Sequence, residues 1–382
     1  MEPDSIAYPV RRIFRRYRNV SCRMAEVEEV NCDARFIQTS IGNISFDYLV
    51  IATGSETNYY DFEPVKSQLL VLKTMPDALN IRSYVYQNLE KAIANYTDES
   101  LEEIMNIAIV GGGPAGIELA GALAEMKKHV IPKDFPDLDT SRMNINLYQS
   151  GPRVLKGMSD EASDKALKYL HQMGVNVLLN ARVVTYENDC ISLADGSCFP
   201  TDTVIWTAGV RGAPIKGLPE ESQAGGNRIL VDAFNKVKGT TTIYAIGDVA
   251  CATSEENPKG HPMLAPVAQQ QGRQLAKNFA RLLRNRETEA FEYRDRGVMA
   301  TIGRVRAVAD LPNWKFQGSF AWFVWMLVHI LSLVGFRNKL SALYSWAFNY
   351  LSYDRPLGLI IRPYRRESDR QAMPKTPGNK PT

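Results

Sequence analysis

Cysteine and histidine are both scarce in this sequence, and their scarcity excludes several classes of protein. Five cysteines, none of them in a CxxC pair, argue against a disulfide scaffold, a redox dithiol and a four-cysteine zinc site. With four histidines and no HExxH motif, we expect no metal site. No apolar run follows the early arginines, so we expect no secretion signal and a cytoplasmic body.

The length and charge of the chain indicate several domains and a basic C-terminal region. At about 150 residues per domain, 382 residues predict two to three domains with a sizeable core. The net charge is +3, but residues 311–382 carry ten Lys or Arg against three acids, which makes this region +7 and the remainder −4. A basic tail on a slightly acidic body predicts an anionic surface as partner.

Five arginines between residues 6 and 18 surround Ile6, Val10, Ile13 and Phe14. This spacing is typical of one helix with an apolar face and a basic face. A nucleic-acid-binding arm would also be rich in arginine. We favour a solvated helix face and expect no nucleic acid as partner.

A glycine-rich turn between a strand and a helix is the strongest motif in the sequence. The apolar stretch 107–110 predicts a buried strand that runs into Gly111-x-Gly113-x-x-Gly116 and an apolar-faced helix at 117–128. The first glycine permits the tight turn, the second lets the backbone approach a pyrophosphate, and the third allows close helix–strand packing. The helix N-terminus adds free N–H groups and a positive dipole end. We therefore expect this turn to bind a dinucleotide.

The end of the next strand bears on which nicotinamide cofactor is bound. This strand, at 145–149, continues a βαβαβ series that runs to residue 179. In NAD-preferring sites a carboxylate at this position binds the ribose 2′-OH, but here the strand ends in Gln149, with Arg153 and Lys156 close behind. We expect NADH to be bound here and NADPH to be accepted as well.

Two further apolar strands flank this series, and each ends in residues suited to a cofactor. Tyr48-Leu-Val-Ile-Ala-Thr-Gly54 ends in a small-residue turn, and Thr242-Ile-Tyr-Ala-Ile-Gly-Asp248 ends in a carboxylate. Each alone would suit an ordinary buried strand. Together with the glycine-rich unit between them, they resemble the flavoprotein reductases with two dinucleotide domains, in which such an aspartate lies against the ribityl chain of the flavin.

The motifs of the chain occur in one order: Glu2-Pro-Asp-Ser-Ile-Ala-Tyr-Pro9, Ala52-Thr-Gly54, Gly111-Gly-Gly-Pro-Ala-Gly-Ile-Glu-Leu-Ala-Gly-Ala-Leu123, Trp206-Thr-Ala-Gly-Val210 and Tyr244-Ala-Ile-Gly-Asp248. In that order they resemble the type II NADH:quinone oxidoreductases, also called alternative NADH dehydrogenases. The aromatic segment 321–338 is similar to the membrane-attachment region of that family. The resemblance covers nearly the whole chain.

This resemblance implies a flavoenzyme that passes a hydride from NADH to FAD and reduces a membrane quinone without pumping protons. It places Glu118 near the nicotinamide and Gln270 on the quinone side, as the catalytic residues. Gln270 matches the second glutamine of the family's Ala-Gln-x-Ala-x-Gln motif, while Pro266 replaces the first; a polar helix start with an exposed Gln270 is the alternative. The cofactor-binding residues that the resemblance implies for NADH, NADPH and FAD are Gly111, Gly113, Gly116, Gln149, Thr53, Gly54, Gly209, Gly247, Asp248 and Gln271.

One part of the family's pattern is missing from this sequence. Members begin with a strand and a first GxGxxG turn for FAD, upstream of the Glu-Pro-Asp-Ser stretch, which starts here at residue 2. That turn supplies the helix N-terminus that neutralises the FAD pyrophosphate. The alternative function is therefore a catalytically silent remnant that binds NAD(P)H and membrane but no FAD. A soluble flavin disulfide reductase is disfavoured by the lack of CxxC.

The C-terminal segment predicts membrane attachment. Residues 316–336 form a run of 21 residues without a charge, and a second uncharged run spans 340–353. At about 1.5 Å per residue the first run could cross a hydrocarbon core. Its scattered aromatic residues, its polar residues and the flanking cations instead favour helices that lie in the interface. We expect peripheral attachment to the anionic cytoplasmic face of the cell membrane, and we leave a homodimer open.

The expected fold class is α/β, with two Rossmann-like dinucleotide-binding domains, the first incomplete, and a C-terminal amphipathic helical membrane-attachment region. The expected boundaries are 1–103 for the first part of the FAD-binding domain, 104–212 for the NAD(P)H-binding domain, 213–312 for the return segment of the FAD-binding domain with the quinone-side helix, 313–364 for the membrane-attachment helices and 365–382 for a disordered tail.

Overall fold

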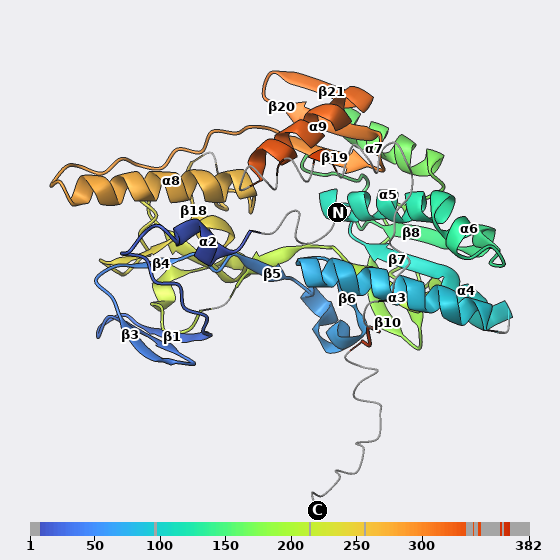
Figure 1. The fold of residues 1–382 in the computed structure, drawn as a ribbon, viewed down its shortest axis with the longest axis horizontal. Helices are drawn as coiled ribbons and strands as arrows, with labels where there is room; N and C mark the ends of the chain where they lie inside the picture. Colours follow the sequence, from blue (N-terminus) through green and yellow to red (C-terminus); the bar gives the residue numbers. More distant parts are fainter. Residues whose placement is uncertain are drawn as a thin grey trace, which may run out of the picture. The chain divides into compact units, whose positions relative to one another are not determined.

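The computed structural model describes residues 8–94, 98–213, 215–255, 257–333, 339, 343–344, 360 and 363–366. They belong to two compact units (Figure 1). Unit 1 is built from Tyr59–Gly209 and from Gly297 onward, and unit 2 from Pro9–Asn58 and Val210–Arg296. Three expectations fall outside the described residues: the motif at 2–7, most of the uncharged run at 340–353, and the tail from residue 367.

Unit 1 is organised around a five-stranded sheet with the order β6-β13-β7-β8-β9, in which every neighbouring pair is parallel. All residues of the central strand β7 are buried, as is usual for a strand covered on both faces. Helices α5 and α7 connect β7 to β8 and β8 to β9, which confirms the predicted βαβαβ series. The elements are β6 (Leu70–Val71), α3 (Met75–Ile93), α4 (Asp98–Met105), β7 (Asn106–Val110), α5 (Pro114–His129), α6 (Ile131–Asp134), β8 (Asn144–Tyr148), α7 (Asp160–Gln172), β9 (Asn176–Leu178) and β13 (Thr203–Trp206).

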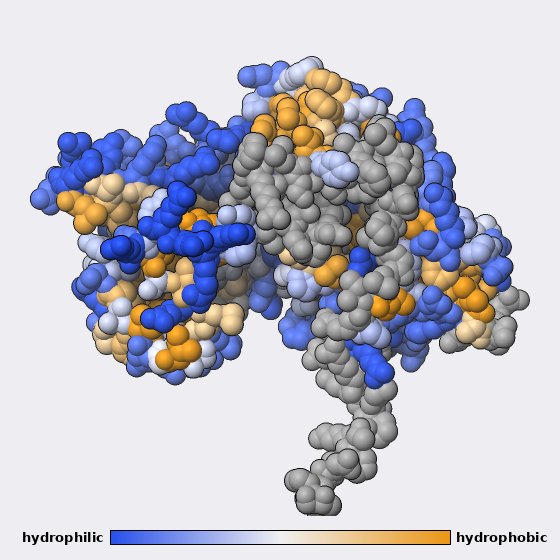
Figure 2. Space-filling model, viewed as in Figure 1, coloured by the Kyte–Doolittle hydropathy of each residue, from blue (hydrophilic) through white to orange (hydrophobic). Residues whose placement is uncertain are grey.

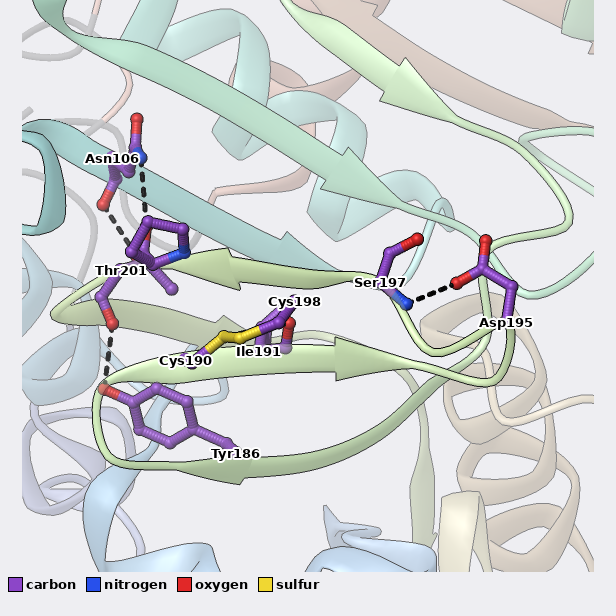
Figure 3. The surroundings of a disulfide bond; sticks show 9 residues. Asn106, Tyr186, Cys190, Ile191, Asp195, Ser197, Cys198 and Thr201 are labelled. Carbon is purple, nitrogen blue, oxygen red and sulfur yellow. Dashed lines mark hydrogen bonds between the residues drawn. A yellow bond between two sulfur atoms is a disulfide. The ribbon is translucent and has the colours of Figure 1, made fainter.

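A three-stranded antiparallel sheet lies between β9 and β13 in the chain and carries a disulfide bond (Figure 3). Its strands are β10 (Val183–Glu187), β11 (Cys190–Leu193) and β12 (Cys198–Pro200). Cys190 and Cys198 join β11 to β12 across a Cα–Cα distance of 6.0 Å. The scarcity of cysteine therefore excludes a disulfide scaffold but not this single local bridge. The strands turn at 195–196, where Gly196 has positive φ, and at Asn188 and Asp189, which both have positive φ.

The C-terminal part of unit 1 is a small antiparallel sheet followed by an apolar helix. The elements are β19 (Val298–Ile302), β20 (Arg306–Leu311), β21 (Trp314–Gly318) and α9 (Ser319–Ser332). Helix α9 packs on β20 and β21, and α5 packs on β19. Across the part of the chain that the structure describes, no helix combines the length and the hydropathy needed to span a bilayer.

Unit 2 consists of short strands around a small apolar core, with one long helix. Its only two-stranded parallel sheet in the described residues is β17–β4, and an antiparallel meander, β1-β2-β3, precedes β4 in the chain. The elements are α2 (Val10–Phe14), β1 (Val27–Asn31), β2 (Phe36–Thr39), β3 (Gly42–Ser45), β4 (Leu49–Ile51), β5 (Ser55–Thr57), β14 (Val210–Gly212), β15 (Gln223–Ala224), β16 (Arg228–Val231), β17 (Ile243–Ala245), β18 (Ala250–Ala252) and α8 (Ala265–Leu282).

The predicted N-terminal helix is shorter than expected. The helix predicted at 6–18 covers only Val10–Phe14 among the described residues; it has no capping side chain and buries no residue. The next strand, β1, begins at Val27. Helix α3 starts at a capping box formed by Thr74 and Asp77.

Candidate functional site

The glycine turn after β7 is so tight that two of its positions have no room for a side chain. Gly111 has a φ of +115°, and a Cβ there would lie 2.7 Å from Ala208 Cα. At Gly116 a Cβ would lie 1.9 Å from the Gly111 carbonyl oxygen and 2.8 Å from Thr207 Oγ1. The Thr207 hydroxyl, just after β13, donates to the Val110 carbonyl at 3.0 Å. The first turn of α5 therefore packs directly on the carboxyl ends of β7 and β13.

Gly113 differs from its neighbours, since no atom of a described residue lies within 4 Å of the place that its Cβ would occupy. It is the N-cap residue of α5, with a φ of −77° that any residue can adopt. The first N–H groups of a helix have no acceptor within the helix, and its dipole attracts negative charge. The turn is thus closed on its inner side and open at Gly113, which fits the approach of a pyrophosphate.

Gln149 and Arg153 both make contacts within the protein. Gln149 Oε1 accepts a hydrogen bond from the Gly112 N–H at 2.9 Å, so this side chain holds the glycine turn. Arg153 is ion-paired with Asp160 and donates to the Lys156 carbonyl at 3.0 Å, so it holds the loop after β8. Arg153 and Lys156 are the two cations that follow Gln149 in the chain. Lys156 is exposed, and its side chain has no ion pair or hydrogen bond to another described residue.

Glu118 lies on the face of α5 that packs against β19. Glu118 Oε1 accepts hydrogen bonds from the Thr301 N–H at 3.2 Å and from Thr301 Oγ1 at 3.3 Å. Burial raises the pKa of Glu118, while the two hydrogen bonds from Thr301 and the charge of His329 act in the opposite direction. One turn further along the same face, a Cβ at Gly121 would lie 2.6 Å from the Gly303 N–H nitrogen. The absence of a side chain at Gly121 therefore lets β19 come close enough to reach Glu118.

Gly209, after β13, lies under an aromatic ring. A Cβ there would lie 2.6 Å from Tyr60 Oη, so the Tyr60 ring sits directly over this glycine.

The predicted site residues fall into two groups. The group in unit 1 comprises Gly111, Gly113, Gly116, Glu118, Gln149 and Gly209, and the group in unit 2 comprises Thr53, Gly54, Gly247, Asp248, Gln270 and Gln271.

The carboxyl ends of β4 and β17 carry the site residues of unit 2. Because these two strands are parallel neighbours, Gly54 and Asp248 follow them at the same edge of the pair. Ser55 Oγ donates to Asp248 Oδ2 at 2.6 Å. Gly54 has a φ of +72° and no atom within 4 Å of its Cβ position, while Thr53 beside it is exposed. A carboxylate and an open backbone at one strand edge suit a hydroxyl-rich ligand such as the ribityl chain of a flavin.

Gln270 and Gln271, at the start of α8, hold neighbouring backbone. Gln271 is only 1% exposed; its Oε1 accepts from the Gly247 N–H at 2.7 Å and its Nε2 donates to Asn235 Oδ1 at 2.9 Å. The two amide atoms of Gln270 pair with the N–H and C=O of Arg294 at 3.0 and 2.9 Å. Gln271 was predicted among the cofactor-binding residues, and in the structure its buried amide holds the turn that presents Asp248.

Three partners of these residues were not anticipated from the sequence. Ser55 follows the Ala-Thr-Gly motif directly, so a polar residue at that place was a usable signal for a contact to Asp248. Thr301 is 183 residues from Glu118 and lies within a buried strand, and Asn235 sits in a turn between strands. No local pattern marks either of the last two as part of a site.

Comparison with known proteins identifies this arrangement. The profile of the pyridine nucleotide-disulphide oxidoreductase family matches residues 4–272, and that of the NDH2 C-terminal domain matches residues 296–352. The type II NADH:quinone oxidoreductase NdhA of Mycobacterium tuberculosis is 28% identical over 372 residues, which cover 93% of this chain and 78% of that protein. The type II NADH:quinone oxidoreductase of Haemophilus influenzae is 28% identical over 305 residues, 75% of this chain and 68% of that protein.

A solved structure has the same fold. NDH2 from Plasmodium falciparum in complex with NADH superposes with a TM-score of 0.82 at 21% identity, over 91% of this chain and 87% of that one. These matches confirm the predicted α/β fold class and the predicted resemblance, and nothing in them favours a silent remnant. The chain therefore belongs to the pyridine nucleotide-disulphide oxidoreductase family and resembles, within it, the type II NADH:quinone oxidoreductases.

Proposed function

We propose that this chain is an NADH:quinone oxidoreductase that binds NADH through unit 1 and FAD through unit 2, and that reduces a membrane quinone without pumping protons. The observation that carries the proposal is the turn at Gly111–Gly116, which is packed on its inner side and open at Gly113. An open backbone at the N-terminus of α5 is the feature that a dinucleotide pyrophosphate requires. The names of the relatives support the same reaction.

FAD, when bound, supplies the redox chemistry, since it accepts a hydride from nicotinamide and passes electrons to a quinone. Asp248 and Gly54 are the residues that would hold its ribityl chain, because they lie at one edge of the β17–β4 pair. Ser55 fixes the Asp248 carboxylate through one oxygen. Gln271 has an indirect role, as its buried amide fixes the backbone of Gly247.

Glu118 is proposed as the residue near the nicotinamide. Its carboxyl is fixed by Thr301, and its raised pKa lets it hold a proton at a higher pH than an exposed glutamate does. A fixed carboxyl of this kind suits a position beside a reacting group, where a proton must be held or moved. Gln270, which the family places on the quinone side, would act there through the backbone segment that it holds.

NADH is the proposed donor, with NADPH accepted less well. Gln149 carries no charge that would repel a 2′-phosphate, but its amide oxygen already holds the Gly112 N–H. Arg153 is engaged by Asp160, which leaves Lys156 as the cation for that phosphate. A comparison of kcat/KM for the two nucleotides tests this, and a K156Q variant should lose activity with NADPH while keeping that with NADH.

Peripheral membrane attachment through α9 is the third part of the proposal. Phe320, Phe323, Leu327 and Leu331 recur at helical spacing and are 45–60% exposed. Figure 2 shows hydrophobic residues gathered over this part of unit 1. An apolar helix face of this kind lies in the interface of a bilayer, where a quinone is dissolved. Since NADH is a cytoplasmic metabolite, we place the attachment on the cytoplasmic face.

Cosedimentation with phospholipid vesicles tests the attachment. A variant with serine at Phe320 and Phe323 should lose vesicle binding but keep NADH binding, because the glycine turn is unchanged. Equal binding by this variant and the parent chain would refute attachment through α9. An alkaline carbonate wash should release the parent chain from membranes, and full retention would favour an integral protein instead.

The reaction itself is tested on the purified full chain with a water-soluble quinone. We expect NADH-dependent quinone reduction and one flavin released per chain on denaturation, identified as FAD by chromatography. A colourless protein that binds NADH and reduces no quinone even after incubation with FAD would overturn the proposal in favour of a remnant.

A further inference from the structure

A groove in unit 2 lies along the side of α8, beyond the strand ends that carry Asp248. Helix α8 forms one wall and the segment 289–296 forms the other. The groove encloses about 680 Å³ and is lined mainly by polar and charged side chains. Figure 2 shows hydrophilic residues over this helix. The lining residues that bear on its chemistry are Arg273, Gln274, Lys277, Glu292, Arg294 and Arg296.

Two side-chain amides fix the second wall to the helix. Gln270 pairs with the backbone N–H and C=O of Arg294 at 3.0 and 2.9 Å. Asn278 makes the same paired contact with the backbone of Glu289, at 3.0 and 2.9 Å. Phe291, between these two positions, donates its N–H to the Ala233 carbonyl at 2.7 Å. The shape of the groove is therefore built by the fold itself and does not depend on a ligand.

Four cations face the groove, and no ion pair with a described residue neutralises their charges. Arg273 and Lys277 are one helical turn apart on α8, and Arg294 and Arg296 come from the opposite wall. All four are exposed, and none has an ion pair or a side-chain hydrogen bond to another described residue. Like charges four residues apart destabilise a helix, so an anion bound between Arg273 and Lys277 would relieve that repulsion.

The two lining carboxylates differ in what they contact. Glu289 is ion-paired with Arg281 and also accepts from Gln274 at 3.4 Å, so it is already neutralised. Glu292 remains as the one acid facing the four cations. The groove therefore presents an excess of three positive charges, from four cations less one carboxylate.

We propose that this groove is a binding site for a phosphate-bearing anion, either the headgroup of an anionic phospholipid or a free phosphate compound. Guanidinium groups bind phosphate oxygens through paired N–H donors, and three of the four cations are arginines. Amide and ammonium groups from Gln274 and Lys277 supply further donors. Gln270, proposed above for the quinone side, fixes one wall of this groove. None of the four cations is among the residues proposed to bind a cofactor or the quinone, so the inference does not rest on the quinone reaction.

The experiment compares three variants of the full chain with the parent chain in two binding assays. The groove variant is R273Q/K277Q, in which glutamine keeps helix propensity. The control is R15Q/R16Q, which changes the charge of unit 2 equally at exposed arginines outside the groove. The third form, E292Q, removes the lining acid. The assays are calorimetric titration with inorganic pyrophosphate, and sedimentation with phosphatidylcholine vesicles with and without an equal amount of phosphatidylglycerol.

We expect R273Q/K277Q to bind about 25-fold more weakly than the parent chain, from about fivefold per cation near an anionic surface. E292Q should bind more tightly than the parent, a result that misfolding cannot produce, and the R15Q/R16Q control should match the parent.

The two assays distinguish the two sources of phosphate. A change confined to pyrophosphate identifies a free phosphate compound, and a change confined to the phosphatidylglycerol vesicles identifies a lipid headgroup. Any vesicle binding through α9 is common to all forms and cancels in the comparison. If the groove variant and the control behave alike in both assays, the proposal is overturned.

Discussion

Replacing Gly113 or Gly116 with alanine separates nucleotide binding from folding at the same turn. At Gly116 the added Cβ would lie 1.9 Å from the carbonyl oxygen of Gly111, so backbone must move. At Gly113 it would meet no atom within 4 Å in the part of the chain that the structure describes, and the backbone there is in an ordinary extended conformation. The two variants add the same methyl group three residues apart, and each is the control for the other.

The expected sizes of the two effects differ. Overpacking against backbone places Gly116→Ala near the upper end of the range of about 1–3 kcal/mol. Gly113→Ala replaces glycine at an N-cap, which costs at most about 1 kcal/mol. For the affinity of the folded protein for NADH the order is reversed, and Gly113→Ala should have the larger effect. A methyl group at Gly113 holds the pyrophosphate away from the helix N-terminus, and losing one charge-assisted hydrogen bond of about 1.5–3 kcal/mol weakens binding by about 10- to 150-fold.

Thermal unfolding and NADH titration of both variants measure these effects. At about 2–4 °C for each kcal/mol in a unit of this size, Gly116→Ala should lower Tm by about 6–12 °C and Gly113→Ala by no more than about 4 °C. Gly113→Ala with a parental Tm and a parental affinity for NADH would refute the assignment of this turn to the nucleotide.

Three other perturbations test particular contacts of unit 1. Burial gives Glu118 a folded pKa above its unfolded value, so the stability of the protein should fall as the pH rises from the unfolded pKa through the folded pKa. Thr301→Val removes a donor to the carboxylate and should extend this pH window upward, whereas Glu118→Gln should abolish the dependence. Denaturant unfolding at several pH values measures both effects. Cys198→Ser opens a loop that is closed by a disulfide at a sequence separation of 8. By the chain-entropy relation, this should lower the free energy of unfolding by about 2.6 kcal/mol, as measured in urea. An unchanged urea midpoint would show that the bridge does not constrain the unfolded chain. Asp202→Ala removes the partner of Arg366, whose side chain is 12% exposed and 3.0 Å from that carboxylate, and it also removes an acceptor for Tyr84 and Asn88; it should cost about 3–5 kcal/mol. Replacing both Asp202 and Arg366 with apolar residues should recover only part of this stability, because Tyr84 and Asn88 still lack that acceptor.

The part of the site that could be predicted from sequence is the part that is local in the chain. The turn at Gly111–Gly116 requires its glycines for reasons confined to a strand, a turn and a helix, and those reasons are visible in their spacing. The Gly247–Asp248 strand end is of the same kind. The parallel pairing of β4 with β17 follows once both are recognised as apolar strands that precede turns suited to a cofactor.

The contacts that escaped prediction join residues far apart in the chain. Glu118 depends on Thr301, and the approach of the two depends on Gly121 having no side chain, which no periodicity in either segment reveals. Gln271 is polar and sits beside Gln270 in the sequence, yet helical geometry turns it inward, where its amide replaces water for the backbone of Gly247. The extent of the first helix was overestimated because its apolar residues find no partner to bury against among the described residues.

Anaerobic addition of NADH to the FAD-loaded chain tests the central claim most directly. If unit 1 presents a nicotinamide to a flavin held by unit 2, the visible absorption of the flavin bleaches with one equivalent of NADH and returns when a quinone is added. Flavin that stays oxidised in the presence of saturating, demonstrably bound NADH would contradict the account.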